Sequence, residues 1–91
     1  PGCCGVKIFM GSSTGDLLVS EDPFLDRILK NVTRPISVHC EDEKLLIERK
    51  PIATQGAHAR FHNKWRNVRS ALHATQRIVH FAEKHNRSVH V

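Results

Sequence analysis

The sequence predicts an α/β fold in which the strands run parallel. Three short β-rich runs, at residues 6–10, 36–39 and 88–91, alternate along the 91 residues with segments whose apolar residues recur at helical spacing. Strands separated by helices usually pair in parallel through right-handed crossovers. Three parallel strands leave two bare edges and one uncovered face. The order therefore suits a slice of a larger barrel or sheet better than a complete domain.

The first strand and its loop are bounded by glycines. Residues 6–10 lie between Gly5 and Gly11, and residues 11–16 form a polar stretch rich in turn-forming residues. This stretch does not have the spacing of a P-loop or of a dinucleotide-binding fingerprint.

The first helix is predicted from its start signal and its apolar face. Asp22 is suited to cap the helix and Pro23 to be its first residue. The residues that fall on one face are Phe24, Leu25, Ile28, Leu29 and Val32. The helix is expected to end before Pro35, because the residue before proline avoids the helical region.

The second half of the chain predicts a strand, two helices and a last strand. After the strand at 36–39, residues 41–50 predict a short helix stopped by Pro51, and residues 52–64 predict an irregular polar connection. A long helix follows, and residues 88–91 begin the third strand. The expected packing face of the long helix is Trp65, Val68, Leu72, Thr75, Val79 and Ala82.

Composition excludes several classes of protein. The chain is 40% hydrophobic and 25% charged, which argues against disorder, and no apolar run approaches the roughly 18 residues of a membrane span. The net charge of +5 alone would favour nucleic acid, but the basic residues are scattered and favour a mixed solvated surface. Three cysteines, an odd count, predict no disulfide framework and a reducing, cytoplasmic setting. The start has neither a signal peptide nor a Met, as expected of an internal fragment.

Two polar residues stand in the strands where a parallel α/β protein builds its site. Lys7 lies within an apolar strand, where burial of a charged amine is costly and favours the neutral, nucleophilic form. The alternative is an edge-strand lysine that points to water. His39 ends the next strand, and the carboxylates at 41–43 are able to orient its ring as a metal ligand. The alternative is a core histidine bonded to a backbone carbonyl.

The remaining histidines and cysteines give weaker signals. His58 and His62 are four residues apart but lie in a segment with poor helix signals, so they are expected to be exposed. The adjacent Cys3 and Cys4 lack the spacing of a zinc site. Three further histidines are expected on the polar face of the long helix: His73, His80 and His85.

Several motifs together resemble those of bacterial dihydroorotases. The run GVKIFMGSSTG at 5–15, followed by LLV at 17–19, resembles the lysine strand and loop of that family. The run VHCEDE at 38–43 resembles the next metal strand, and NVRSA at 67–71, in the helix leading to VHV at 89–91, resembles the approach to the strand after it. The resemblance spans the chain. It implies an amidohydrolase (β/α)₈ barrel domain, of which residues 1–91 cover strands four, five and the start of six.

The resemblance also implies a metal centre. Lys7 matches the lysine that becomes carboxylated and bridges two zinc ions, and it is the predicted catalytic residue as well as a metal ligand. His39 matches a second metal ligand, whereas His90 precedes the position of the next one. The implied reaction is the reversible hydrolysis of dihydroorotate to N-carbamoyl-aspartate in pyrimidine biosynthesis. The family's other metal ligands, its catalytic aspartate and its substrate-binding arginine are outside this stretch, so the isolated chain is expected to be inactive.

Other functions remain open from sequence alone. Hydantoinases and allantoinases share the lysine and histidine layout, a non-catalytic dihydroorotase-like protein would share the fold, and charge alone would support a basic nucleic-acid-binding module. The favoured prediction is a small-molecule substrate, with no nucleic-acid or membrane partner. An assembly of identical subunits is compatible with it for the intact enzyme.

Overall fold

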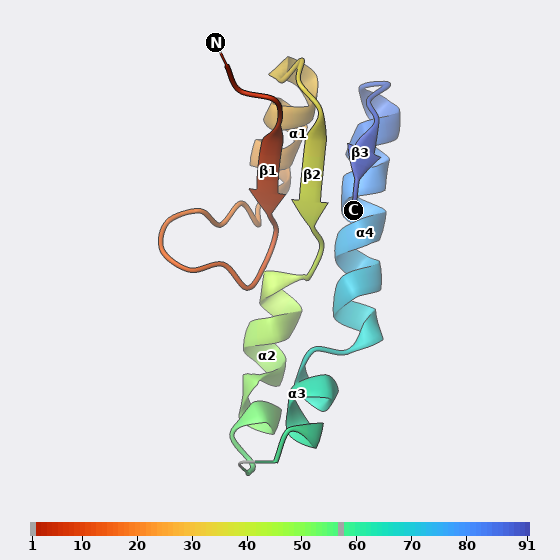
Figure 1. Ribbon diagram of the computed structural model, residues 1–91. Coiled ribbons are helices and arrows are strands. Elements are labelled where there is room, and N and C mark those ends of the chain that lie inside the picture. Colours follow the sequence, from red (N-terminus) through yellow and green to blue (C-terminus); the bar gives the residue numbers. More distant parts are fainter. Residues whose placement is uncertain (1, 57) are drawn as a thin grey trace.

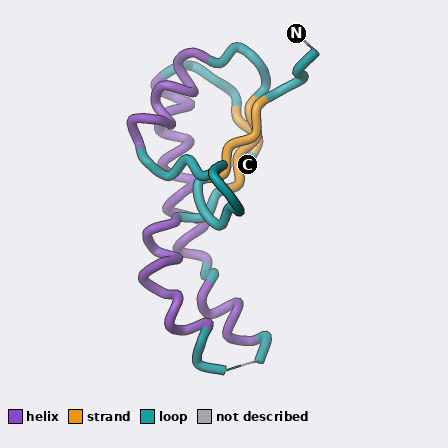
Figure 2. The backbone as a smooth tube through the Cα atoms, turned by 90° about the vertical axis from the view of Figure 1, so that its left-hand side faces the viewer, coloured by secondary structure: helices purple, strands orange, loops and turns teal. Residues whose placement is uncertain are grey.

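The computed structural model describes residues 2–56 and 58–91, which form one three-stranded parallel sheet with helices on one of its faces (Figures 1 and 2). The strands lie in the order β1-β2-β3, and both neighbouring pairs are parallel, so the predicted α/β class is confirmed. The elements in chain order are β1 (Val6–Phe9), α1 (Asp22–Asn31), β2 (Ile36–His39), α2 (Glu43–Ala53), α3 (Arg60–Trp65), α4 (Val68–Lys84) and β3 (Val89–His90).

The two faces of the sheet have opposite character because side chains alternate along a strand. One face packs against α1 and α4, and its strand residues are buried: Ile8, Ile36 and Val38. The other face carries Lys7, Phe9, Ser37, His39 and His90, and Figure 2 shows no helix over it in the described part of the chain. The register pairs Lys7 with Ser37, Phe9 with His39, and Ser37 with His90.

Helix α1 follows the sequence prediction closely. Its N-cap is Glu21 rather than Asp22, and Pro23 lies in the first turn. Leu25 and Leu29 are fully buried against the sheet and α4, whereas Phe24, expected on the same face, is exposed. The helix thus buries the centre of its predicted apolar face and leaves one edge of that face open.

Helix α4 packs with a different face from the predicted one. It begins at Val68, and its buried residues are Ser70, Ala74, Ile78, Phe81 and Ala82, of which only Ala82 was expected. The predicted residues Val68, Leu72 and Val79 are 83%, 53% and 40% exposed. Both rows have helical spacing, and the row with Ala74, Ile78 and Phe81 is the one that joins the hydrophobic core.

Helix α2 continues past the proline that was expected to stop it. It ends at Ala53, with Pro51 in its last turn, and begins at Glu43 with the Asp42 carboxylate accepting a hydrogen bond from the Leu45 amide at 3.1 Å. A proline disturbs the turn before it, but the helix needs only two more residues to reach its end. The Thr54 hydroxyl donates to the Pro51 carbonyl at 2.9 Å and closes that end.

The connection at 52–64 is not irregular throughout, because it contains the short helix α3. This helix lies against α2, below the carboxyl ends of the strands in Figure 1. The Trp65 indole donates to the Leu46 carbonyl at 2.7 Å, and the Arg49 Nε donates to the Trp65 carbonyl at 3.2 Å. These side-chain hydrogen bonds join α2 and α3. The sequence alone gives no signal that predicts α3 or these bonds.

The described part of the chain contains neither a candidate membrane-spanning helix nor a disulfide. Within residues 2–56 and 58–91, every helix is too short or too polar to cross a membrane. Cys3 and Cys4 are exposed free thiols, and Cys40 is a buried free thiol whose pKa is raised by burial.

Candidate functional site

Lys7 lies in the middle of edge strand β1, on the face that no helix covers in the described chain. Its side chain is exposed, and its Nζ lies 5.5 Å from the centroid of the Phe9 ring. The expected burial of this amine is not found, because no further strand lies beside β1 in the described chain to exclude water. The exposure matches the alternative of an edge-strand lysine. The metal and catalytic roles of Lys7 remain predictions.

His39 ends β2 and shares the open face of the sheet with Lys7. Its ring centroid is 6.2 Å from that of Phe9, its register partner on β1, and the two rings are tilted by 54°. Phe9 therefore lies beside both predicted ligands, Lys7 on its own strand β1 and His39 on the neighbouring strand β2. The structure places Lys7 and His39 on one face of adjacent strands. His39 lies at the carboxyl end of β2, whereas Lys7 lies two residues before Phe9 and pairs with Ser37.

A carboxylate holds one nitrogen of the His39 ring. Glu41 Oε1 lies 3.2 Å from His39 Nε2, and the side chains of His39 and Glu41 are 36% and 16% exposed. At this distance the carboxylate faces Nε2, and Nδ1 is the ring nitrogen turned away from it. A backbone carbonyl, the partner of a core histidine, is replaced here by a side chain from the predicted acidic run.

Arg66 extends this pair toward the loop that follows β1. Its Nη1 donates to Glu41 Oε1 at 3.1 Å, and its Nη2 donates to the Ser12 hydroxyl. The Ser12 amide in turn donates to Glu43 Oε2 at 2.8 Å. Sequence patterns did not identify Arg66, because it lies 25 residues from Glu41 and 54 residues from Ser12.

The loops after β1 and β2 are in close contact beneath this cluster. A Cβ on Gly11 would lie 2.3 Å from the Glu41 carbonyl oxygen, so this position requires glycine. Ser12 adopts a φ of 55°, and the Met10 amide donates to the His39 carbonyl at 3.1 Å. The strand end that carries His39 is therefore fixed by backbone contacts as well as side chains.

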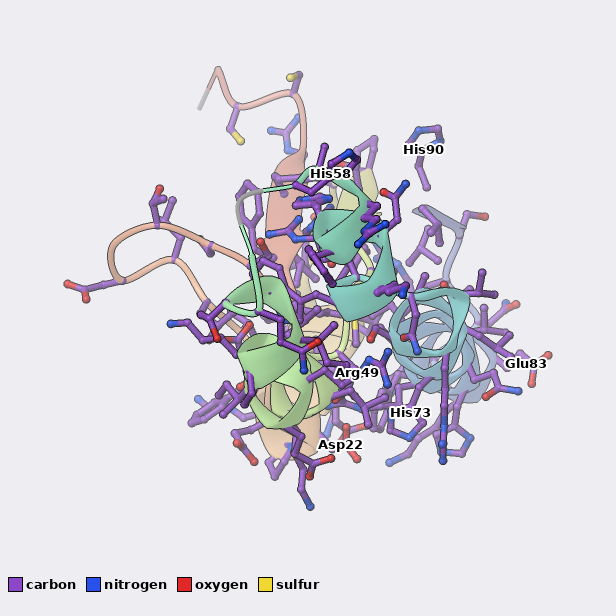
Figure 3. The ribbon with its side chains drawn as sticks, turned by 90° about the horizontal axis from the view of Figure 1, so that it is seen from below. Asp22, Arg49, His58, His73, Glu83 and His90 are labelled. Carbon is purple, nitrogen blue, oxygen red and sulfur yellow. The ribbon has the colours of Figure 1, made fainter. Side chains whose placement is uncertain are left out.

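A second polar cluster lies on the helical side of the sheet. The Asp42 side chain is 4% exposed, and its Oδ2 lies 2.6 Å from His73 Nδ1 and 3.0 Å from Arg77 Nη1. Arg77 also contacts Asp22 at 2.7 Å, and these residues line an open cavity of about 770 Å³. Figure 3 shows Asp22 and His73 on the side of the molecule opposite His90, so this cluster is separate from the face of Lys7 and His39.

The pKa of Asp42 predicts an acid-dependent contribution to stability. Burial acts to raise this pKa, but the Leu45 amide, His73 and the hydrogen bond from Arg77 outweigh it and hold the pKa below the ordinary 3.8. A carboxyl with a pKa depressed by folding stabilises the fold above its unfolded pKa and loses that contribution as pH falls through the folded value. We expect Asp42→Asn to destabilise the chain near neutral pH, and the difference from wild type to shrink below about pH 4.

Urea unfolding as a function of pH measures this difference. The exposed Asp16, which lies away from this cluster, serves as control: Asp16→Asn should change the free energy of unfolding little at any pH. A wild-type-to-Asp42→Asn difference that stays constant down to the acid limit would contradict the assignment.

The remaining histidines fall into two groups. His58 and His62 are exposed, as predicted. His73 and His85 do more than occupy a polar face, since His73 contacts Asp42 and His85 Nε2 lies 2.7 Å from Asp26. Across residues 2–56 and 58–91, no three His, Cys, Asp or Glu side chains are grouped as a metal site.

Comparison with known proteins places the fold. No family model and no curated protein matches the sequence. L-Hydantoinase (dihydropyrimidinase) from Arthrobacter aurescens superposes with a TM-score of 0.79 at 21% identity, over 91% of this chain and 20% of that one. Dihydropyrimidinase from Brevibacillus agri NCHU1002 gives 0.79 at 22% identity over 97% and 20%, and a D-hydantoinase gives 0.78 at 25% identity over 97% and 20%.

This chain spans about one fifth of the length of these neighbours, and the likeness concerns the fold. The resemblance to dihydroorotases rests on the sequence motifs. The chain has the fold of one segment of a hydantoinase-like (β/α)₈ barrel.

Proposed function

We propose that this chain contributes Lys7 and His39 to the metal centre of a hydrolase that opens cyclic amides. The observation that supports it is the placement of both residues on one open face of adjacent parallel strands, each against Phe9, with Glu41 on the far nitrogen of the imidazole. A metal-ligating histidine almost always donates its other ring N–H to a carboxylate, a carbonyl or water. Glu41, whose Oε1 lies 3.2 Å from His39 Nε2, is the candidate for that partner.

The donor chemistry fits zinc. His39 offers the Nδ1 lone pair, and an imidazole nitrogen is a preferred zinc ligand. The exposed Lys7 amine is accessible to carbon dioxide. In its neutral form Nζ adds to the carbon, one N–H proton leaves, and the carbamate presents two oxygens suited to two cations. Bound zinc lowers the pKa of a coordinated water, which provides a nucleophile near neutral pH.

The chain supplies only part of such a centre. Zinc in proteins takes at least three protein ligands, so two would leave the ion mostly in water. The isolated chain is therefore expected to show no turnover and to bind zinc weakly. The remaining ligands and the proton-transferring group must come from other strands of a complete barrel.

There are two candidates for the substrate of the proposed hydrolase: dihydroorotate, and the group of hydantoins and dihydropyrimidines. The motifs at 5–15 and 38–43 favour dihydroorotate, and the names of the structural neighbours favour hydantoins and dihydropyrimidines. All contain a ring amide, but dihydroorotate also carries a ring carboxylate that needs a cationic partner. Dihydroorotate is the first candidate, since its support comes from the residues of this chain.

The test uses a protein in which this segment is joined to the remaining strands and helices of the barrel, here called the complete-barrel protein. Ring opening of dihydroorotate, hydantoin and dihydrouracil is measured with and without a zinc chelator. We expect chelator-sensitive hydrolysis with dihydroorotate preferred. Preference for hydantoin or dihydrouracil would select the second candidate, and a folded, zinc-loaded protein that opens none of the rings would refute the proposal.

A further inference from the structure

We propose that Arg66 is a positioning residue for His39 and acts on it through Glu41. This inference rests on the proposed function, because it concerns how the histidine is presented to a metal. It assigns a role to Arg66, which the sequence placed at the start of the long helix and the structure places between α3 and α4. Among the described residues, Arg66 forms no hydrogen bond or ion pair with Lys7 or His39.

Arg66 is held in place from several directions. Its amide donates to the His62 carbonyl at 2.9 Å and ends α3, and its guanidinium carbon lies 5.1 Å from the centroid of the Trp65 ring. Trp65 is itself bonded to the Leu46 carbonyl of α2 at 2.7 Å. The position of the guanidinium is therefore set by the packing of α3 on α2 rather than by the loop that carries it.

The contact with Glu41 determines where that carboxylate lies. Arg66 Nη1 and His39 Nε2 share the same oxygen, Oε1, at 3.1 and 3.2 Å. Glu41 is mostly buried, and a buried carboxylate that loses its cationic partner is strongly destabilised. Without Arg66, Glu41 is expected to turn toward water and release His39 Nε2. The imidazole, which is partly exposed, would then sample other rotamers.

Arg66 and Glu41 do not form the two parallel hydrogen bonds of a bidentate arginine–carboxylate pair. Among the described residues, Oε2 of Glu41 and Nε of Arg66 are both buried and lack a hydrogen-bond partner. Arg66 therefore holds Glu41 through a single N–H···O contact and uses its second arm on Ser12. A lysine supplies one contact but not two, so Arg66→Lys is expected to preserve part of the effect on His39 and to lose the link to the loop after β1.

A purely structural ion pair makes a different prediction. In that case Arg66 variants would lower stability and leave the His39 ring as it is in the wild type. The distinguishing measurement is thus the state of the ring itself. It requires no metal and no turnover, so it applies to the 91-residue chain.

The experiment is NMR of the chain without metal, at a pH well above the ordinary histidine pKa of about 6.5. The readouts are the side-chain couplings that report the His39 rotamer and the visibility of its Nε2–H proton. The wild type should show one rotamer and a protected Nε2–H. Arg66→Met should average the rotamers and lose the Nε2–H signal to exchange, and Arg66→Lys should fall between them. Arg69→Met, at an exposed arginine on α4, is the matched control and should leave the ring unchanged.

A double variant tests the route through Glu41. Once Glu41→Ala has released the ring, adding Arg66→Met should have no further effect on His39. Amide spectra of β1 and β2 verify that each variant is folded, and Arg66→Lys replaces Arg66→Met if the latter unfolds. An unchanged His39 ring in a folded Arg66 variant would overturn the inference.

A second readout separates this inference from the proposed function. In the complete-barrel protein, Arg66→Met should weaken zinc affinity by about 10- to 100-fold, the usual effect of losing a group that orients a ligand. If Arg66 variants change the His39 ring but His39 is not needed for zinc binding, Arg66 positions His39 and the proposed metal role of His39 is wrong. If His39 is required for zinc but the ring ignores Arg66, the metal role stands and this inference fails.

Discussion

Hydrolysis of the cyclic amide should be lost when Lys7 is replaced by alanine in the complete-barrel protein. Removal of groups that merely orient a metal ligand costs about 10- to 100-fold, so removal of a bridging ligand should lower kcat by more than about 100-fold. The fold should tolerate the change, because Lys7 is exposed and its Nζ lies over the neighbouring Phe9 ring rather than in the core. Activity and zinc content of the purified variant are the quantities to measure.

Chemical rescue makes the Lys7 test specific. Short carboxylic acids supply two oxygens in place of the carbamate, and they should restore part of the activity of Lys7→Ala. Lys30→Ala, at an exposed lysine in the last turn of α1, is the matched control and should keep wild-type activity. Full activity in Lys7→Ala without added acid would remove Lys7 from the metal centre.

The second large effect is expected at His39. In the complete-barrel protein, His39→Ala should lower the zinc bound per chain while the protein stays folded. In the proposed centre the imidazole of His39 is a zinc ligand, and metal affinity depends on deprotonated donors of this kind. The stability effect should be small because the ring is only partly buried and lies outside the hydrophobic core.

Zinc stoichiometry and urea unfolding, measured on the same samples, decide this question. His62→Ala is the control, since His62 is an exposed histidine on α3, and it should leave the zinc content unchanged. A histidine that only packs would behave in the opposite way. His39→Ala with full zinc content and lowered stability would establish that His39 is structural.

The exposed apolar residues of the two outer helices are consistent with a barrel segment. Phe24 of α1 lines an open groove of about 770 Å³ together with Leu18 and Val32, and α4 exposes Val68 and Leu72. Helices of a (β/α)₈ barrel form a ring around the sheet, so each has neighbours on both sides. This arrangement accounts for the two apolar rows that compete in the sequence of α4.

The sequence alone determined the order of the strands, their parallel pairing and the order of the helices other than α3. Apolar periodicity together with glycine and proline signals located β1, α1 and β2 within a few residues, since these signals act between near neighbours in the chain. The sequence also located Lys7 and His39 in adjacent strands. The register that puts both side chains on one face came from the structure.

Only the tertiary structure decided which face of α4 is buried and what surrounds His39. Periodicity shows that two rows on α4 are suited to packing, but only the tertiary structure places the row with Ala74 and Ile78 in the hydrophobic core. The ion pair of Arg66 with Glu41 joins residues 25 positions apart, and that of His73 with Asp42 joins residues 31 apart. Such pairs form because the packing of helices on the sheet brings distant charges together, and no local pattern encodes that distance.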